Sequence, residues 1–348
     1  MAVEKTSRLI WLDVCRVIAS FAVMIIHISS QFLAEVEAGS HEWVALRAYR
    51  DCGGFAVPVF VMISGTLFLS RDLSISVILK KYVRRIALIY VVWSALYVIV
   101  LMHSEGPMTM LGNFVSGWFS HLWYLYMVAG LYLVSPILRK IVTDEKLMKY
   151  FLALGLAFYV AGCDLIEIIT LISRKAGGYF QSAYSSMGVT LCTGLVFYYV
   201  LGYFFGSRKL HQGQLTAVYE MGLAVYVLTI CSFLFRIRCG SVYLGDVLTE
   251  LEAVRVLKAV FVFTLIGQIC QRIPDRAAGI IGEMGRLSLG AFLIHQLVIT
   301  LLNRWFGLNT RSFETAVSVP VIGVLVFLLS YGLIRLIRFI PFVKKYLT

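Results

Sequence analysis

Long apolar segments separated by short polar ones constrain the fold of this chain more than any other feature of its sequence. These segments lie at 9–33, 54–70, 83–103, 120–139, 148–171, 187–206, 215–235, 253–271, 287–306 and 316–337. A helix needs about 20 apolar residues to cross the hydrocarbon core of a bilayer. The sequence therefore predicts an all-α integral membrane protein, a bundle of about ten transmembrane helices.

The overall composition agrees with this interpretation. Hydrophobic residues make up 60% of the 348 residues and charged residues 14%, whereas soluble domains contain about 25% charged residues. A soluble globular enzyme is thereby excluded. Because the connecting loops are short and no linker or repeat is visible, residues 1–348 are expected to form a single transmembrane domain with no fused soluble domain.

The net charge of +12 is distributed in short clusters of Lys and Arg between the apolar segments. This distribution encodes membrane topology, and nucleic-acid binding is not expected. With the amino terminus inside, twenty of the 31 Lys and Arg residues are cytoplasmic, ten lie on the other side, and Arg16 lies within the first span. The positive-inside rule therefore predicts that both termini are cytoplasmic.

No metal site is expected from the sequence. The seven cysteines show neither a CxxC pair nor metal-ligand spacing, and most of them lie within apolar segments. They are best interpreted as small hydrophobic residues. Motifs for a hydrolase triad, a zinc protease or a phosphate-binding loop are also missing.

A line of polar residues runs along the first apolar segment. Arg16 and His27 are eleven residues apart, which is about 1100° of helical rotation, about 20° from three full turns, and about 16.5 Å of rise. Asp13 precedes Arg16 by three residues and Ser20 follows it by four, so all four side chains share one face. Such a line must face protein and not lipid, because ionisable groups within spans are costly and usually functional.

These residue types have two interpretations. Asp13 and Arg16 could form an ion pair near the cytoplasm, with His27 packed near the outer boundary. Alternatively, an imidazole can remove a proton from a hydroxyl at neutral pH, and a guanidinium can hold a phosphate or a carbonyl oxygen. The alignment of Arg16 with His27 favours a functional site.

The chain resembles the membrane-bound acyltransferase family 3, which includes O-acetyltransferases of bacterial surface polysaccharides. The Arg-x10-His spacing from Arg16 to His27 is the most specific match. Further matches are VPVFVMISGTLFL (57–69), KKYVRRIALIY (80–90), HLWYLYMVAGLYLVSPIL (121–138) and SLGAFLIHQLVI (288–299). The chain is similar to the compact members of the family, which include the enzyme that acetylates enterobacterial common antigen.

The resemblance implies a multi-pass protein of the bacterial cytoplasmic membrane. Its expected reaction moves an acetyl group from cytoplasmic acetyl-CoA to a hydroxyl of a cell-envelope glycan or its lipid-linked precursor. Acetyl-CoA would be a substrate, with no permanently bound cofactor and with membrane lipids as the surroundings. His27 would be the general base, or would carry the acetyl group covalently, and Arg16 would position the donor, with Asp13 supporting it. The oligomeric state is not indicated.

A basic cluster and an aromatic segment supply further candidates. Lys80, Lys81, Arg84 and Arg85 lie where the third span begins and are expected to bind the CoA phosphates, although such clusters also encode topology and contact lipid head groups.

On the acceptor side, the candidates are His121, Trp123 and His295. Trp123 could stack on a sugar ring or belong to the interfacial aromatic belt. His295 could equally hydrogen-bond a neighbouring helix. Two rival functions remain open, a transporter of a polar substrate and an acyltransferase with a non-carbohydrate acceptor.

Overall fold

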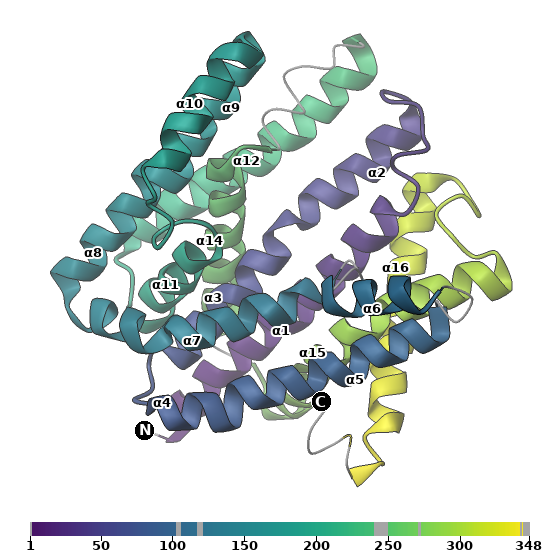
Figure 1. The fold of residues 1–348 in the computed structure, drawn as a ribbon, viewed down its shortest axis with the longest axis horizontal. Coiled ribbons are helices and arrows are strands. Elements are labelled where there is room, and N and C mark those ends of the chain that lie inside the picture. Colours follow the sequence, from purple (N-terminus) through teal and green to yellow (C-terminus); the bar gives the residue numbers. More distant parts are fainter. Residues whose placement is uncertain are drawn as a thin grey trace.

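The computed structural model describes residues 2–101, 106–116, 121–239, 250–270, 273–341 and 343, and these residues contain helices and no strands. In chain order the helices are α1 (Ala2–Ser30), α2 (His41–Cys52), the 3-10 helix η1 (Gly53–Phe55), α3 (Ala56–Phe68), α4 (Ile75–Val77), the π-helix η2 (Ile78–Val83), α5 (Arg84–Leu101), α6 (Pro107–Ser116), α7 (Trp123–Thr143), α8 (Glu145–Leu154), the π-helix η3 (Gly155–Gly162), α9 (Cys163–Ile172), α10 (Arg174–Ser186), α11 (Gly194–Ser207), α12 (Gln212–Cys239), α14 (Glu252–Ile269), α15 (Asp275–Phe306) and α16 (Thr315–Ile337). Figure 1 shows them as one bundle.

Eight helical stretches in the described part of the chain are long and apolar enough to cross a membrane: Ile10–Ser30, His41–Phe68, Ile75–Leu101, Trp123–Thr143, Glu145–Ile172, Gln212–Leu234, Arg276–Phe306 and Thr315–Ile337. The prediction of an all-α membrane protein is confirmed. The other two expected spans correspond to α11, which is apolar but has only 14 residues, and to α14, which has 18 residues and three charged side chains. Length and composition alone therefore support eight spans.

The first helix lies in the middle of the bundle. It packs against α2, α3, α14, α15 and α16, and Figure 1 shows it crossing behind α3 and α15. The buried share is 56% for the α1 span and 61% for the α15 span, but only 17% for the span Glu145–Ile172. The polar line of α1 is thus enclosed by protein, while α8 to α9 lie at the periphery.

The closest helix contact joins α3 to α11 through glycines. A Cβ atom added at Gly65 would lie 1.8 Å from the Tyr199 carbonyl oxygen, and one at Gly202 would lie 2.2 Å from the Met62 carbonyl oxygen. The Thr66 hydroxyl donates a hydrogen bond to the Gly202 carbonyl at 2.7 Å. Small residues allow such close approach where burial from water cannot drive helix association.

This contact predicts a large difference between two glycine substitutions. Gly65→Ala should destabilise the protein by about 3 kcal/mol, because the new methyl group meets the backbone of a neighbouring helix. Gly130→Ala in α7 is the matched control, since nothing lies within 4 Å of its added Cβ and alanine favours a helix. Thermal unfolding in detergent measures both, and equal midpoints would contradict the prediction.

Candidate active site

Asp13 and Arg16 of α1 form an ion pair, with side chains 16% and 28% exposed. The pair lies against α15, since a Cβ atom at Gly285 would be only 2.5 Å from the Asp13 carboxyl carbon. The Ser20 hydroxyl donates to the Arg16 carbonyl oxygen at 2.8 Å. Only a glycine at position 285 leaves room for this carboxylate, so the contact between α1 and α15 sets the position of Arg16. We call this side of the bundle the Arg16 end.

Tyr132 of α7 connects Arg16 with the basic cluster. Its hydroxyl is within range of electrostatic interaction with Arg16, Arg71 and Arg85. No local sequence pattern indicates that residues of α1 and α5 share this neighbour. The structure therefore brings Arg85 and Arg16 to one region.

Aromatic rings accompany these cations. Tyr132 stacks on Phe68 with ring centroids 4.3 Å apart, and Tyr82 meets both rings edge to face. The Lys81 ammonium lies 5.5 Å from the centroid of the Tyr82 ring. The four basic side chains Lys80, Lys81, Arg84 and Arg85 are exposed. Flat rings beside exposed cations suit a ligand that carries both a planar base and phosphates.

Three histidines from separate segments meet at the other end of the α1 line. The ring centroid of His27 lies 5.0 Å from that of His295 in α15 and 6.3 Å from that of His121, which precedes α7. The rings of His121 and His295 are 5.1 Å apart. His121 and His295 are buried, with exposed fractions of 1% and 0%. We call these three residues the histidine cluster.

Backbone carbonyls define which nitrogen of two cluster members carries hydrogen. Nε2 of His121 donates to the Leu293 carbonyl at 3.1 Å, and Nδ1 of His295 donates to the Phe292 carbonyl. Because a carbonyl only accepts, the other nitrogen of each neutral ring has a free lone pair. His121 Nδ1 and His295 Nε2 are buried without a hydrogen-bond partner among the described residues. Leaving a buried acceptor unpaired costs about 1–3 kcal/mol, so the cluster favours a hydrogen-bond donor between its rings.

Tyr97 of α5 holds the part of α15 that carries this cluster. Its hydroxyl donates to the Leu293 carbonyl at 2.8 Å and accepts from the Leu297 amide at 3.1 Å. Leu293 thus receives hydrogen bonds from both Tyr97 and His121. The hydrogen bonds of Tyr97 and His121 therefore fix how far α15 is shifted along its axis, and how it is rotated about that axis, where it carries His295.

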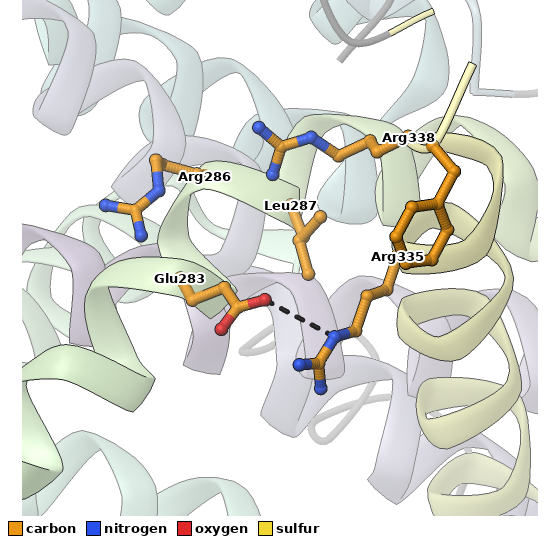
Figure 2. A pocket seen from close by; sticks show the side chains of 6 residues that line it. Glu283, Arg286, Leu287, Arg335 and Arg338 are labelled. Carbon is orange, nitrogen blue, oxygen red and sulfur yellow. Dashed lines mark ion pairs between the residues drawn. The ribbon is translucent and has the colours of Figure 1, made fainter. Parts of the chain in front are cut away.

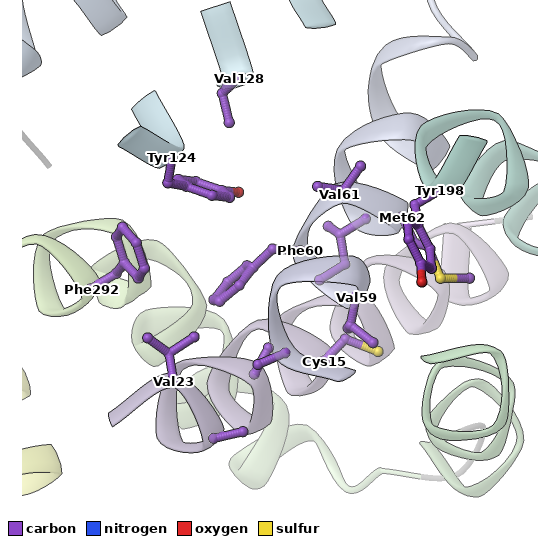
Figure 3. Packing of buried hydrophobic residues seen from close by; sticks show 14 of the residues in the cluster. Cys15, Val23, Val59, Phe60, Val61, Met62, Tyr124, Val128, Tyr198 and Phe292 are labelled. Carbon is purple, nitrogen blue, oxygen red and sulfur yellow. The ribbon is translucent and has the colours of Figure 1, made fainter. Parts of the chain in front are cut away.

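Three aromatic side chains separate the Arg16 end from the histidine cluster. The ring centroids of Phe60, Tyr124 and Phe292 are 5.0 to 6.2 Å apart, with the ring planes inclined by 57° to 67°, and Figure 3 shows the three rings grouped together. Phe292 contacts the ring of His295 at 5.6 Å, while Tyr124 is within electrostatic range of Arg16. We call these residues the aromatic trio. It lies between the two groups that the α1 line connects.

Trp123 is placed differently from His121. It is 42% exposed, and the described ring contacts join it to no member of the histidine cluster. The sequence places both residues among the acceptor-side candidates. The structure instead places Tyr97 and Phe292 beside His121, at 5.2 and 5.7 Å between centroids.

A second polar group lies beside α1 near His27. A pocket of about 150 Å³ there is lined by Ile26, Arg50, Asp51, Gly54, Glu250, Arg255 and Lys258. Lys258 of α14 is 2% exposed and donates to the Asp51 carbonyl at 3.2 Å. Sequence reasoning missed this residue, although a lysine within an apolar segment was the signal that could have identified it.

Metal chemistry has no support from these positions. Within the described ranges, no group of three or more His, Cys, Asp or Glu side chains is arranged to hold a metal ion.

A bundle of apolar helices with a buried line of Arg and His side chains defines a membrane protein with an intramembrane polar site. A family model described as an acyltransferase domain matches residues 9–335. The chain therefore belongs to the membrane-bound acyltransferase family 3, and it is an acyltransferase. No curated protein and no solved structure matches it.

Proposed function

We propose that this protein is an O-acetyltransferase that moves an acetyl group from cytoplasmic acetyl-CoA to a hydroxyl of a cell-envelope glycan or its lipid-linked precursor. The observation that carries the proposal is the histidine cluster, placed along α1 from the Asp13–Arg16 pair and presenting two unpaired nitrogen acceptors. A hydroxyl is a donor of the kind that such acceptors bind.

His27 acts as the general base. The acceptor oxygen attacks the thioester carbonyl carbon while its proton moves to a ring nitrogen of His27. The carbon–sulfur bond then breaks, and the CoA thiolate leaves and takes that proton. His295 and His121 accept hydrogen bonds from the hydroxyl or from the protonated His27 ring. A covalent acetyl-His27 intermediate is the variant of the same chemistry.

The donor enters at the Arg16 end. The guanidinium of Arg16 holds the donor, and the exposed cations Lys80, Lys81, Arg84 and Arg85 bind its phosphates. The rise from Arg16 to His27 is about 16.5 Å, which is of the same order as the length of the pantetheine arm. On the other side of the membrane, the pocket lined by Arg50, Arg255 and Lys258 provides cations that can bind the acceptor.

This assignment requires a defined topology. We infer ten crossings of the bacterial cytoplasmic membrane, with the shorter α11 and the charged α14 added to the eight apolar stretches. The excess of Lys and Arg then places both termini in the cytoplasm. The antiparallel packing of α16 on α1 supports this, because Gly323 of α16 lies beside Ile25 of α1 and Phe327, one turn further along α16, contacts Phe21, one turn earlier in α1.

The donor side makes a specific prediction. Replacing Lys80, Lys81, Arg84 and Arg85 together by Gln should lower acetyl-CoA affinity about tenfold or more at low salt, and the difference should shrink as salt screens the wild-type site. The control is the double variant Lys140→Gln/Lys146→Gln, whose side chains are also exposed. Calorimetric titration at two salt concentrations measures the effect. Unchanged affinity in correctly folded protein would leave the four cations a topological role only.

The proposed function itself is tested by acetyl transfer. Purified protein in lipid vesicles, given labelled acetyl-CoA and lipid-linked glycan, should move label to the glycan, and mass spectrometry of envelope glycans should show an acetyl difference between cells with and without the protein. Label transferred to a peptide or small molecule instead would show a non-carbohydrate acceptor. Movement of a polar solute with no transfer would identify a transporter.

A further inference from the structure

A pocket of about 460 Å³ lies between α15 and α16 at the Arg16 end of the bundle. It is lined by Glu283, Arg286, Leu287, Arg335, Arg338 and Phe339. Figure 2 shows these side chains from close by. Neither the acetyl donor nor the acceptor has been assigned to this pocket.

The pocket has an excess of positive charge. Glu283 pairs with Arg335 at 3.4 Å, and Figure 2 shows the Arg286 and Arg338 guanidinium groups away from that pair. Within the described residues, neither Arg286 nor Arg338 has an ion-pair partner within 4 Å. The Nε atom of Arg338 is buried and has no hydrogen-bond partner there. Arg286 also lies within electrostatic range of Asp13, but three guanidinium groups share the lining with one carboxylate, and this excess of positive charge favours an anion.

The chemistry of the lining identifies the class of anion. Planar guanidinium groups bind phosphate oxygens through paired hydrogen bonds, and basic pockets between membrane helices bind lipid head groups. Apolar side chains continue from the pocket along the surface: Phe339 is 81% exposed, Leu336 63% and Ile340 53%. A ligand with a phosphate head and hydrocarbon chains matches both parts of this surface.

Helical geometry separates the pocket from the route to His27. Arg286 and His295 are nine residues apart in α15, about 900° of rotation, so they lie on opposite faces of the helix. Gly290, four residues after Arg286, is on the pocket side, because a Cβ atom there would lie 2.8 Å from Ile334 of α16. A CoA molecule with its phosphates in this pocket would therefore start on the face of α15 opposite His295. The pocket therefore fits a lipid better than the acetyl donor.

We propose that the pocket formed by Arg286, Arg335 and Arg338 binds the phosphate head group of an anionic phospholipid, with the acyl chains lying over Phe339 and Leu336. The lining of this pocket contains none of the residues to which the acetyl-transfer reaction was assigned.

Binding of defined lipids to the purified full-length protein tests the proposal. Native mass spectrometry and thermal unfolding compare phosphatidylglycerol with phosphatidylcholine, for the wild type and for Arg286→Gln/Arg338→Gln. We expect the wild type to bind phosphatidylglycerol and to be stabilised by it. The double variant should bind phosphatidylglycerol at least about tenfold more weakly, because it loses two charge-assisted contacts. Lys140→Gln/Lys146→Gln removes the same charge elsewhere and should bind as the wild type does.

Equal phosphatidylglycerol affinity in wild type and pocket variant would overturn the proposal. If that variant also loses acetyl-CoA affinity, the pocket belongs to the donor phosphates instead. If the Gln variant does not fold, Arg286→Lys/Arg338→Lys keeps the charge and loses the planar fork; it should lose affinity severalfold, and unchanged affinity would equally reject the site.

Discussion

Replacing His27 by alanine is expected to lower acetyl transfer at least about 100-fold while acetyl-CoA still binds. The imidazole is needed when the hydroxyl proton moves, and general bases contribute about 100-fold or more to such steps. The groups proposed to bind the donor lie at the Arg16 end, eleven residues and about 16.5 Å along α1 from His27. Single-turnover transfer from labelled acetyl-CoA, normalised to folded protein, measures the first quantity, and equilibrium titration measures the second.

His41→Ala is the control for this experiment, because His41 is exposed at the start of α2 and lies outside the histidine cluster. It should leave transfer unchanged. Near-normal turnover by His27→Ala would reject His27 as the base. A loss of folded protein without a selective loss of turnover would show that His27 only packs the helices.

Arg16→Lys is expected to weaken acetyl-CoA binding about tenfold although the charge is kept. A lysine cannot make the two parallel hydrogen bonds of a guanidinium, and it would also lose the geometry of the pair with Asp13. The expected signature is a raised KM with a smaller change in kcat. Asp13→Asn should cause a smaller loss, because it removes only the group that orients Arg16.

The outcome that contradicts this prediction is also defined. If Arg16 and Asp13 served only as an ion pair between α1 and α15, both substitutions would reduce the yield of folded protein equally and leave KM unchanged. Comparing the two variants at matched amounts of folded protein separates these cases.

Local features of this protein could be predicted from its sequence. The spacing of Asp13 and Arg16 places them one turn apart, and they form an ion pair in the structure. The apolar segments predicted the all-helical membrane fold because hydropathy is a property of contiguous residues. The boundaries were less accurate. The second span begins at His41, before the apolar segment, because α2, η1 and α3 follow one another without a break.

Features that depend on packing between distant segments could not be predicted. His27, His121 and His295 meet because α1, α15 and the segment before α7 pack together, and no local pattern encodes that contact. The proximity of Tyr132 to Arg16 could not be predicted for the same reason, because it depends on packing between distant segments. The hydrogen bonds that fix the tautomers of His121 and His295 involve backbone carbonyls, which carry no sequence signal.

The aromatic trio affects how easily protons and ions could pass through this protein. Phe60, Tyr124 and Phe292 pack against one another between Arg16 and the histidine cluster, and protons and ions do not cross a hydrophobic constriction that excludes water. A protein whose polar groups extend along one central helix could otherwise leak protons down their gradient. Under the proposed reaction, these rings would insulate the two sides from each other between turnovers and would have to move aside when the acetyl-bearing arm of the donor reaches His27.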